Sequence, residues 1–404
     1  MGTKNRVIIL TLAAILLGSC GGGGGSTAST NSGGSTAGSS GGGTGGGSGG
    51  GGTTGGIGSA PTTGNFVYVS NASAGNVSAF SANLTTGELT LVPGSPFAGQ
   101  DGNYSIAVAP KVGYAYASST TNSSIYATAI NPMTGVLTPL PSNPYFIGAG
   151  PISIAIDPSN KFVYTANSGS NNVSGLTIGS DGTLTEISGS PFAAGNQPEF
   201  VVVNPNGNFV YVTNDGNNTI SVFSIDAATG ALREIAGSPF PTGDSPRGIA
   251  VDPLGKFLYV ANFLSSKLSA YSIDPATGAL GPLTGSPFQT SGGSSIAIER
   301  TGKYLYLANG LTVDGFTLQN GIPTPLPGNT FNGGGPFAGG NRSTALAIDS
   351  NGDFVYVLDN LNDAIDVLSI DPTTGNLSAV SGSPFLLVPG SAFGVGPTII
   401  VVTN

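Results

Sequence analysis

Short apolar runs separated by turn residues make up the chain from residue 64 onward, and this pattern repeats. In each copy a tyrosine is preceded by an aromatic residue and an apolar one. The anchor tyrosines are Tyr68, Tyr116, Tyr164, Tyr211, Tyr259, Tyr306 and Tyr356, at spacings of 48, 48, 47, 48, 47 and 50 residues. A period of this length, filled with strands instead of helical periodicity, is typical of a propeller with four-stranded blades. The pattern therefore predicts an all-β, seven-bladed β-propeller.

The fourth copy shows how one repeat divides into strands. Asn208–Thr213 is the strand that contains the tyrosine, Thr219–Ile225 alternates polar and apolar residues, and Ala231–Ile235 is a shorter, charged strand. Gly248–Val251 is the first strand of the following blade. Such first strands are unbroken apolar runs rich in alanine, as in Ile249-Ala250-Val251. A strand covered on both faces has this composition, so we expect these strands innermost, beside the axis.

Two turn motifs punctuate the repeat. The motif Asp/Asn-x-x-Thr-Gly-x-Leu occurs at 83–89, 131–137, 226–232, 274–280 and 371–377. Its first side chain is expected to accept a backbone N–H, and its glycine to adopt positive φ. Gly-Ser-Pro-Phe begins at 94, 189, 237, 285 and 382. Its proline is expected to end the outer strand and blunt the sheet edge, with the phenylalanine in the seam between blades.

The two ends of the repeat region predict how the ring closes. The region begins with a tyrosine strand, 66–71, and ends with residues 396–403, which match the inner strand at 150–157. The C-terminal strand is therefore expected to pair with the N-terminal blade, although a spare terminal strand is the alternative. Copy six is irregular, with residues 319–337 in place of the usual outer hairpin, either as a lid or as a decorated loop.

The N-terminus has the features of an export signal. Lys4 and Arg6 precede an apolar run, 7–17, that is too short to span a bilayer. The residues before Cys20 resemble a bacterial lipobox, so we expect a lipoprotein signal peptide at 1–19 and lipidation of Cys20; a chance cysteine is the alternative. Residues 20–64 are expected to form a flexible Gly/Ser/Thr-rich tether, and 65–404 the propeller. The protein is then exported and lipid-anchored in the cell envelope, at the outer membrane if the cell has two membranes.

Charge and composition exclude several classes of partner, catalytic site and cofactor. Without Lys4 and Arg6, 9 of the 11 basic residues remain against 20 acidic ones, so nucleic acid is not expected as a partner. The chain has no histidine, which excludes a Ser-His-Asp triad and imidazole-ligated zinc. With no tryptophan either, a quinone cofactor is not expected, and we predict no cofactor and no metal. We expect a monomer that touches the membrane only through its anchor.

Several motifs together carry a family resemblance. Tyr-Val-Thr-Asn at 211–214, Tyr-Val-Ala-Asn at 259–262 and Asp-Pro-x-Gly-Lys at 252–256 resemble the lactonase-type seven-bladed propellers. This family includes 6-phosphogluconolactonase and carboxymuconate-cyclase-like proteins and is related to the YVTN repeat proteins. The resemblance covers residues 64–404. Its motifs specify strands and turns, so they support the fold better than an activity.

The resemblance implies a site at one mouth of the central channel, where the family's enzymes use Arg, Glu and His. Alignment of the inner strands brings one ring of residues to that mouth: Tyr104, Ile152, Glu199, Arg247, Ser294, Thr344 and Thr398, with Arg342 just upstream of Thr344. Glu199, Arg247 and Arg342 are the candidate catalytic residues, and Tyr104, Ser294, Thr344 and Thr398 the candidate ligand-binding ones. The family histidine has no counterpart. Glu199 would act as a base and the arginines would hold a carboxylate or phosphate, unless these charges form only an ion pair at a wet rim.

Two functions follow from these residues. The leading interpretation is a binding or scaffold module that recognises a protein, glycan or small-molecule ligand with its mouth loops. The alternative is a lactone hydrolase or isomerase, similar to 6-phosphogluconolactonase, that uses Glu199, Arg247 and Arg342. An extracytoplasmic location counts against a sugar-phosphate substrate.

Overall fold

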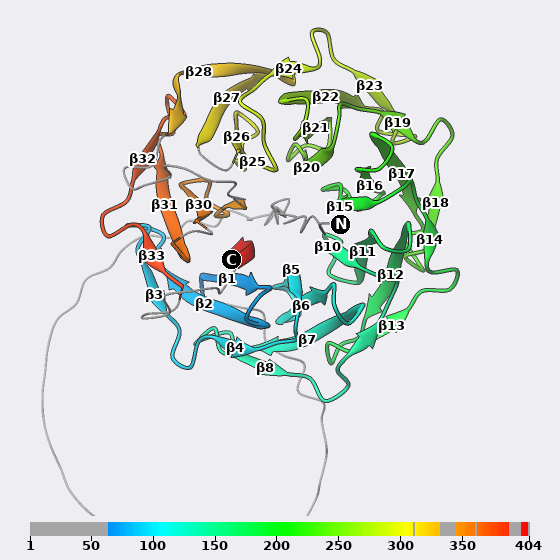
Figure 1. Cartoon of the computed structure of the whole chain (residues 1–404), viewed down its shortest axis with the longest axis vertical. Coiled ribbons are helices and arrows are strands. Elements are labelled where there is room, and N and C mark those ends of the chain that lie inside the picture. Colours follow the sequence, from blue (N-terminus) through cyan, green and yellow to red (C-terminus); the bar gives the residue numbers. More distant parts are fainter. Residues whose placement is uncertain (1–63, 310–311, 332–344, 360–361, 388–396, 403–404) are drawn as a thin grey trace, which may run out of the picture.

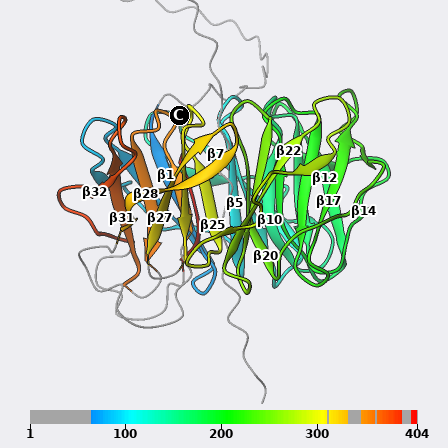
Figure 2. The same cartoon turned by 90° about the horizontal axis from the view of Figure 1, so that it is seen from above.

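Seven antiparallel sheets form a ring in the computed structural model of the chain (Figure 1), which describes residues 64–309, 312–331, 345–359, 362–387 and 397–402. Six sheets have five strands and one has four. Seen from the side, the strands run between the two faces of the ring (Figure 2). The expected seven-bladed, all-β propeller is confirmed. The export signal and tether lie outside the described residues, and within those residues no helix is long and apolar enough to cross a membrane.

The inner strands form the centre of the ring (Figure 1). They are β5 (Asn103–Ala109), β10 (Pro151–Ile156), β15 (Pro198–Val203), β20 (Pro246–Val251), β25 (Ser295–Ile298), β29 (Leu346–Ile348) and β34 (Pro397–Val402). Each contacts the next, and β34 contacts β5, so the ring is closed. Ala107 and Ala297 are fully buried. Small residues fit here because neighbouring inner strands converge, as the apolar runs predicted.

The blade built from the fourth copy continues outward from β15 through β16 (Phe209–Asn214), β17 (Thr219–Ile225), β18 (Leu232–Glu234) and β19 (Phe240–Pro241). The predicted bounds differ by one or two residues at the strand ends. The strands of the other blades are β1 (Phe66–Asn71), β2 (Asn76–Ala82), β3 (Leu89–Leu91), β4 (Phe97–Ala98), β6 (Tyr114–Ser119), β7 (Ser124–Ile130), β8 (Leu137–Pro139), β9 (Tyr145–Phe146), β11 (Phe162–Asn167), β12 (Asn172–Ile178), β13 (Leu184–Glu186), β14 (Phe192–Ala193), β21 (Phe257–Asn262), β22 (Lys267–Ile273), β23 (Leu280–Pro282), β24 (Phe288–Gln289), β26 (Tyr304–Ala308), β27 (Val313–Gln319), β28 (Ile322–Phe331), β30 (Phe354–Asp359), β31 (Ala364–Ile370), β32 (Leu377–Ala379) and β33 (Phe385–Leu386).

Ring closure follows the predicted route. The C-terminal strand β34 pairs antiparallel with β1, with Val402 opposite Val67 and Pro397 opposite Asn71. The sheet order β3-β2-β1-β34 makes the last strand of the chain the inner strand of the first blade. The ends of the repeat region are thus joined by a β-ladder.

The anchor tyrosines tie neighbouring blades together. Six of the seven donate their hydroxyl hydrogen to a glycine carbonyl in the Thr-Gly turn, or its equivalent, of the following blade: Tyr68 to Gly135, Tyr116 to Gly182, Tyr164 to Gly230, Tyr211 to Gly278, Tyr259 to Gly321 and Tyr306 to Gly375. Gly230 has a φ of 75°, and a Cβ there would lie 2.4 Å from the ring of Phe162. The expected positive φ is confirmed, and the close approach of the preceding blade is a second reason for glycine.

The Gly-Ser-Pro-Phe motif does more than end a strand. In the first blade, Phe97 follows the proline and resumes pairing with β2, opposite Val77. Ser95 bridges the interruption by accepting a hydrogen bond from the Ala79 N–H. The expectation that the proline ends the outer strand is therefore wrong in detail: the strand leaves the sheet for one turn and returns. The expected position of the phenylalanine is correct, because Phe97 packs against a cluster shared by two blades.

The sixth repeat differs from the rest, as its sequence indicated. Its outer strand β28 has 10 residues and pairs with β27 on both sides of a register shift. Within the described residues, no separate two-residue strand is added to this sheet. The rest of the irregular segment, from 332 onward, lies outside the described residues.

Candidate functional site

Five of the seven residues aligned from the sequence lie at a recurring β-bulge at the start of the inner strands. In β15, Pro198 pairs with Asn214 and Phe200 with Thr213, so Glu199 has no residue opposite it. The same register shift leaves these residues without an opposite partner: Tyr104, Ile152, Arg247 and Thr398. A bulge redirects the side chain of the extra residue. We call the face of the ring on which these strands begin the mouth face.

Glu199 is held in place by its own blade. The bulge frees the N–H of Phe200, which donates to Thr213 Oγ1 at 3.1 Å. Phe200 is fully buried, so its packing fixes the backbone beside the glutamate. Glu199 itself is only 4% exposed, which is rare for a carboxylate. The sequence-predicted base therefore lies in a rigid, nearly dry position.

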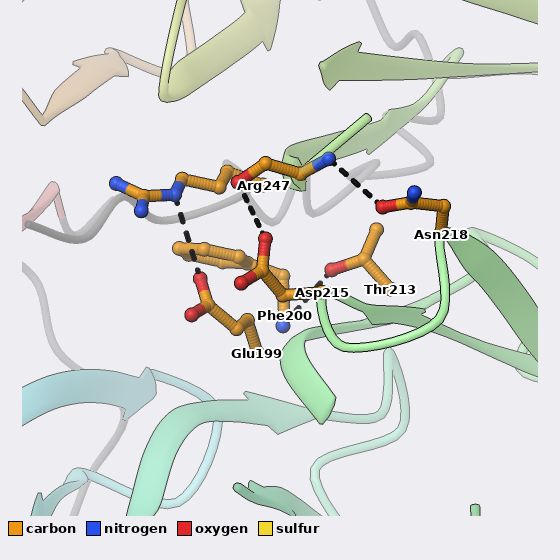
Figure 3. A network of polar contacts seen from close by, with 7 residues as sticks. Glu199, Phe200, Thr213, Asp215, Asn218 and Arg247 are labelled. Atoms are coloured by element: carbon orange, nitrogen blue, oxygen red, sulfur yellow. Dashed lines mark hydrogen bonds and ion pairs between the residues drawn. The ribbon is translucent and has the colours of Figure 1, made fainter. Parts of the chain in front are cut away.

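Arg247 faces Glu199 from the next blade (Figure 3). Its Nε lies 3.8 Å from Glu199 Oε2, and its side chain is 14% exposed. The guanidinium lies over the ring of Phe263, 4.3 Å from the ring centre, which restrains it by a cation–π contact. Neither Arg247 Nε nor Glu199 Oε2 has a hydrogen-bond partner. Two oppositely charged groups thus meet with unused hydrogen-bonding capacity.

The surroundings of Glu199 change its acidity. Burial raises the pKa of its carboxyl from 4.5 to about 7, Arg247 opposes this rise, and the nearby charge of Asp215 adds to it. Near neutral pH the carboxyl therefore exists in both protonation states. A group with this property can accept and return a proton in a reaction.

Tyr104 adds a neutral donor beside the pair. Burial raises the pKa of its phenol well above the usual value, with a further rise from Glu199 and a smaller opposing effect from Arg247. The phenol therefore stays protonated at physiological pH. Tyr104 packs on the cluster that contains Ile152 and Phe200. Of the candidate ligand-binding residues whose side chains the structure describes, Tyr104 is the one that lies close enough to interact electrostatically with Glu199 and Arg247.

The remaining predicted residues are placed differently. Ser294 is 2% exposed, and its carbonyl accepts the N–H of Gly248 at 3.0 Å, so its observed role is to connect two inner strands. Thr398 lies on β34, where the structure describes only the backbone. Arg342 and Thr344 lie outside the described residues. The candidate site is therefore built on Glu199 and Arg247.

Sequence reasoning missed Asp215, which follows β16. Its Oδ1 accepts a hydrogen bond from Ser245 Oγ at 2.5 Å, and the Ser245 N–H donates to Asn218 Oδ1 at 3.0 Å. A signal was present in the sequence. The residue four positions after each anchor tyrosine is Ala72, Thr120, Ser168, Asp215, Phe263, Gly310 and Asn360. Asp215 is the one acidic residue in this series, and it belongs to the same repeat as Glu199.

No cluster of three or more His, Cys, Asp or Glu side chains in the described part of the chain is arranged to hold a metal ion. The described groups that meet at the candidate site are the carboxyl of Glu199, the guanidinium of Arg247 and the phenol of Tyr104, with the carboxylate of Asp215 nearby. This set is suited to binding a polar organic group through hydrogen bonds and to moving a proton.

Comparison with known families gives a match over the blades that carry the site. Residues 97–199 and 187–294 match the model of the family described as lactonase, 7-bladed beta-propeller. Glu199 and Arg247 both lie within these segments. A search of curated protein sequences finds no match.

Solved structures with the same architecture span nearly the whole propeller. A candidate 6-phosphogluconolactonase from Bacteroides fragilis NCTC 9343 aligns with a TM-score of 0.69 and 21% identity, covering 85% of this chain and 100% of that one. One from Bacteroides uniformis ATCC 8492 has a TM-score of 0.68 and 22% identity, with 84% and 99% covered. The periplasmic gluconolactonase of Pseudomonas aeruginosa has a TM-score of 0.67 and 15% identity, with 84% and 99% covered. At these identities the likeness establishes a shared fold.

Proposed function

We propose that this chain, a lactonase-family propeller over residues 97–294, hydrolyses a lactone at its mouth face with Glu199 and Arg247. The observation that carries the proposal is the pair itself. A buried carboxyl whose pKa is raised to about 7 lies 3.8 Å from a guanidinium, and the facing atoms have no hydrogen-bond partner. A purely structural ion pair gains its energy by satisfying such atoms. Of the two functions weighed from the sequence, the pair favours the enzyme.

The chemistry assigns each group a role. Glu199, as carboxylate, accepts a proton from a water molecule whose oxygen attacks the lactone carbonyl carbon. Arg247 stabilises the negative charge that develops on the carbonyl oxygen. The tetrahedral intermediate then collapses, the bond from carbon to ring oxygen breaks, and Glu199 returns the proton to that oxygen. The product is a hydroxy acid, and no metal or cofactor takes part in any step.

A raised pKa explains how the site works without histidine. An exposed glutamate, with a pKa near 4.3, is a weak base at neutral pH. Burial makes the Glu199 carboxylate more basic, so its proton affinity approaches that of imidazole. Proton transfer by a residue with a pKa near the working pH contributes about 10²- to 10⁴-fold to a rate. The missing histidine therefore does not exclude an acid–base mechanism.

The local charges favour a substrate without a phosphate. Among the described residues, the charges that act on Glu199 are the guanidinium of Arg247 and the carboxylate of Asp215. A phosphomonoester carries up to two negative charges and would meet two carboxylates beside one cation. An uncharged lactone avoids this repulsion. The expected export signal at 1–19 and anchor at Cys20 point the same way, because they would place the protein outside the cytoplasm, where a sugar phosphate is not expected.

The test is turnover of a lactone panel by the purified protein. The panel contains δ-gluconolactone, its 6-phosphate and simple γ- and δ-lactones. Hydrolysis is measured as the rate of proton release in excess of the spontaneous rate. Glu199→Gln is expected to lose about 10²-fold or more in kcat, as for loss of a general base. Glu186→Gln, at an exposed position of strand β13, is the matched control and should retain full activity. Full activity in Glu199→Gln would exclude this site as the catalytic one. A wild-type protein that turns over no lactone but binds a glycan or protein would favour the binding module.

A further inference from the structure

Asp215 contacts both backbone segments that carry the proposed catalytic pair. Its N–H donates to the carbonyl of Gln197 at 2.9 Å, two residues before Glu199. Its Oδ1 accepts from Ser245 Oγ at 2.5 Å, two residues before Arg247. Figure 3 shows Asp215 together with Glu199 and Arg247. One residue thus joins the two segments across the seam between blades.

Both segments have a backbone that needs support. Gln197 and Ser245 have φ values of 52° and 55°, an uncommon conformation for residues with a side chain, and each precedes a proline. Side-chain oxygens hold them from the preceding blade: Asn171 Oδ1 accepts the N–H of Gln197, and Asn218 Oδ1 that of Ser245. The left-handed residue and the bulge after it set the direction in which each catalytic side chain leaves the strand.

The backbone contact of Asp215 recurs in other blades, but its carboxylate does not. The N–H groups of Thr120, Ser168 and Phe263 donate in the same way to Gly102, Gly150 and Ser245. The side chains at these equivalent positions are uncharged. At the seam where Glu199 meets Arg247, the hydrogen bond from Ser245 Oγ to the Asp215 carboxylate is thus added to the recurring backbone contact.

The charge of Asp215 acts on the pair as well. It raises the pKa of Glu199, while Arg247 from β20 lowers it and burial is the largest cause of the rise. Among the described residues, the phenol of Tyr104 on β5 is a further titratable group that interacts with the charge of Glu199. Asp215 therefore offsets part of the effect of the guanidinium and favours the protonated form of Glu199.

We propose that Asp215 is a positioning residue of this site: its side chain fixes the segment of Arg247 relative to that of Glu199. The negative charge of Asp215 beside the pair then acts on the protonation of Glu199. The turnover part of this inference rests on the proposed lactonase function. The protonation part does not, because it can be measured without substrate.

Three variants separate the two roles. Asp215→Asn removes the charge but keeps an oxygen that can accept from Ser245. Ser245→Ala keeps every charge but removes the donor. Asp101→Asn removes an exposed carboxylate from the same face in another blade and is the control. Asp215→Ser, which keeps a hydroxyl acceptor, replaces the asparagine variant if that variant does not fold.

The first measurement is the pH midpoint at which the Glu199 carboxyl titrates in the substrate-free protein, followed by infrared or ¹³C spectroscopy. The signal of Glu199 is the one that disappears in the Glu199→Gln variant. We expect Asp215→Asn to lower the midpoint, Ser245→Ala to move it less, and Asp101→Asn to leave it unchanged. An unchanged midpoint in a folded Asp215→Asn protein would overturn the inference. So would a larger shift in Ser245→Ala than in Asp215→Asn.

The second measurement is the pH profile of kcat/KM. Because the base acts as a carboxylate, a lower pKa extends activity to lower pH, so the ratio of rates at pH 6 and pH 8 should rise several-fold in Asp215→Asn. Ser245→Ala should lower kcat with the profile little changed. If no lactone is hydrolysed but the midpoints shift as expected, the proposed function fails and the electrostatic role of Asp215 stands. If Asp215→Asn has the wild-type midpoint and profile while the lactone is hydrolysed, the role of Asp215 fails alone.

Discussion

Tyr164 on β11 donates its hydroxyl hydrogen to the carbonyl of Gly230, 2.7 Å away in the turn of the next blade. Neighbouring blades are thus joined by a directional bond in addition to apolar packing. The bond is repeated at six seams. At the seventh, the buried hydroxyl of Tyr356 has no hydrogen-bond partner.

Replacing these tyrosines by phenylalanine should therefore have unequal effects. Tyr164→Phe leaves the Gly230 carbonyl without its donor, and we expect a loss of about 1 to 3 kcal/mol in the free energy of unfolding. Tyr356→Phe removes a hydroxyl that is buried without a partner, so it should be neutral or stabilising. Urea unfolding of both variants measures the difference. Equal destabilisation would show that the hydroxyl bonds do not hold the seams.

Glu199 should make the stability of the protein depend on pH. Its folded-state pKa of about 7 lies above the unfolded value of 4.5, so the folded protein binds the extra proton between these values. The stability from this group is complete below the unfolded pKa and is lost as pH rises through the folded one. At 1.36 kcal/mol per pKa unit, the loss reaches roughly 3 kcal/mol above pH 7.

Glu199→Gln, which cannot ionise, removes this dependence. The variant should match the wild type in melting temperature near pH 4.5 and exceed it increasingly up to pH 8. Thermal unfolding across this range, with Glu186→Gln as control, makes the comparison. A constant difference between variant and wild type at all pH values would contradict the raised pKa.

Arg247→Gln should change the proton affinity of Glu199 in the opposite direction to Asp215→Asn. The guanidinium lowers the pKa of the carboxyl, so its removal raises that pKa further. Activity at pH 7 should fall, because less carboxylate is present and the oxyanion loses its partner; the acid limb of the pH profile should move to higher pH. Lys267→Gln, at the start of β22 on the same face, is the charge-matched control. An acid limb that stays in place would separate Arg247 from Glu199 in function.

The C-terminal strand should be essential although it is terminal. Residues 397–402 supply the inner strand of the first blade, and β1 loses this ladder when 398–404 are deleted. Each ladder hydrogen bond contributes about 1 kcal/mol, and an open β1 edge invites aggregation. The truncated protein should be insoluble or sensitive to protease. Deleting 22–60, by contrast, should leave the melting temperature unchanged. A soluble truncation with wild-type melting would show that ring closure does not depend on this strand.

Cys20 is expected to carry the lipid anchor, and this can be tested separately from the fold. Cys20→Ala should abolish labelling with a fatty-acid analogue and leave an unprocessed or mislocalised precursor. Stable anchoring needs more than one acyl chain, because each buried methylene contributes only about 0.8 kcal/mol. Normal lipid labelling of the Cys20→Ala protein would disprove the assignment.

The fold was readable from the sequence because its signals are local and repeated. Alternation of period two, the Thr-Gly turns and the alanine-rich runs each act within a few residues, and seven copies make the pattern unmistakable. The pairing of β34 with β1 followed from the same copies, because one strand was missing at the start and one remained at the end. Glu199 and Arg247 were found in this way too. The bulge lies at a constant offset in the inner strand, so alignment of repeats placed both residues on one face.

The tertiary structure decided what happens between blades. The contacts of Tyr164 with Gly230 and of Asp215 with Ser245 join residues 66 and 30 positions apart, and no local pattern specifies such pairs. They depend on how one twisted sheet packs on the next. The proton affinity of Glu199 has the same origin, because it results from burial and from the charges of Arg247 and Asp215, which lie on two other segments of the chain. Sequence periodicity determined the strands and their order; distance and desolvation, which exist only in the assembled ring, determined the chemistry at the seam.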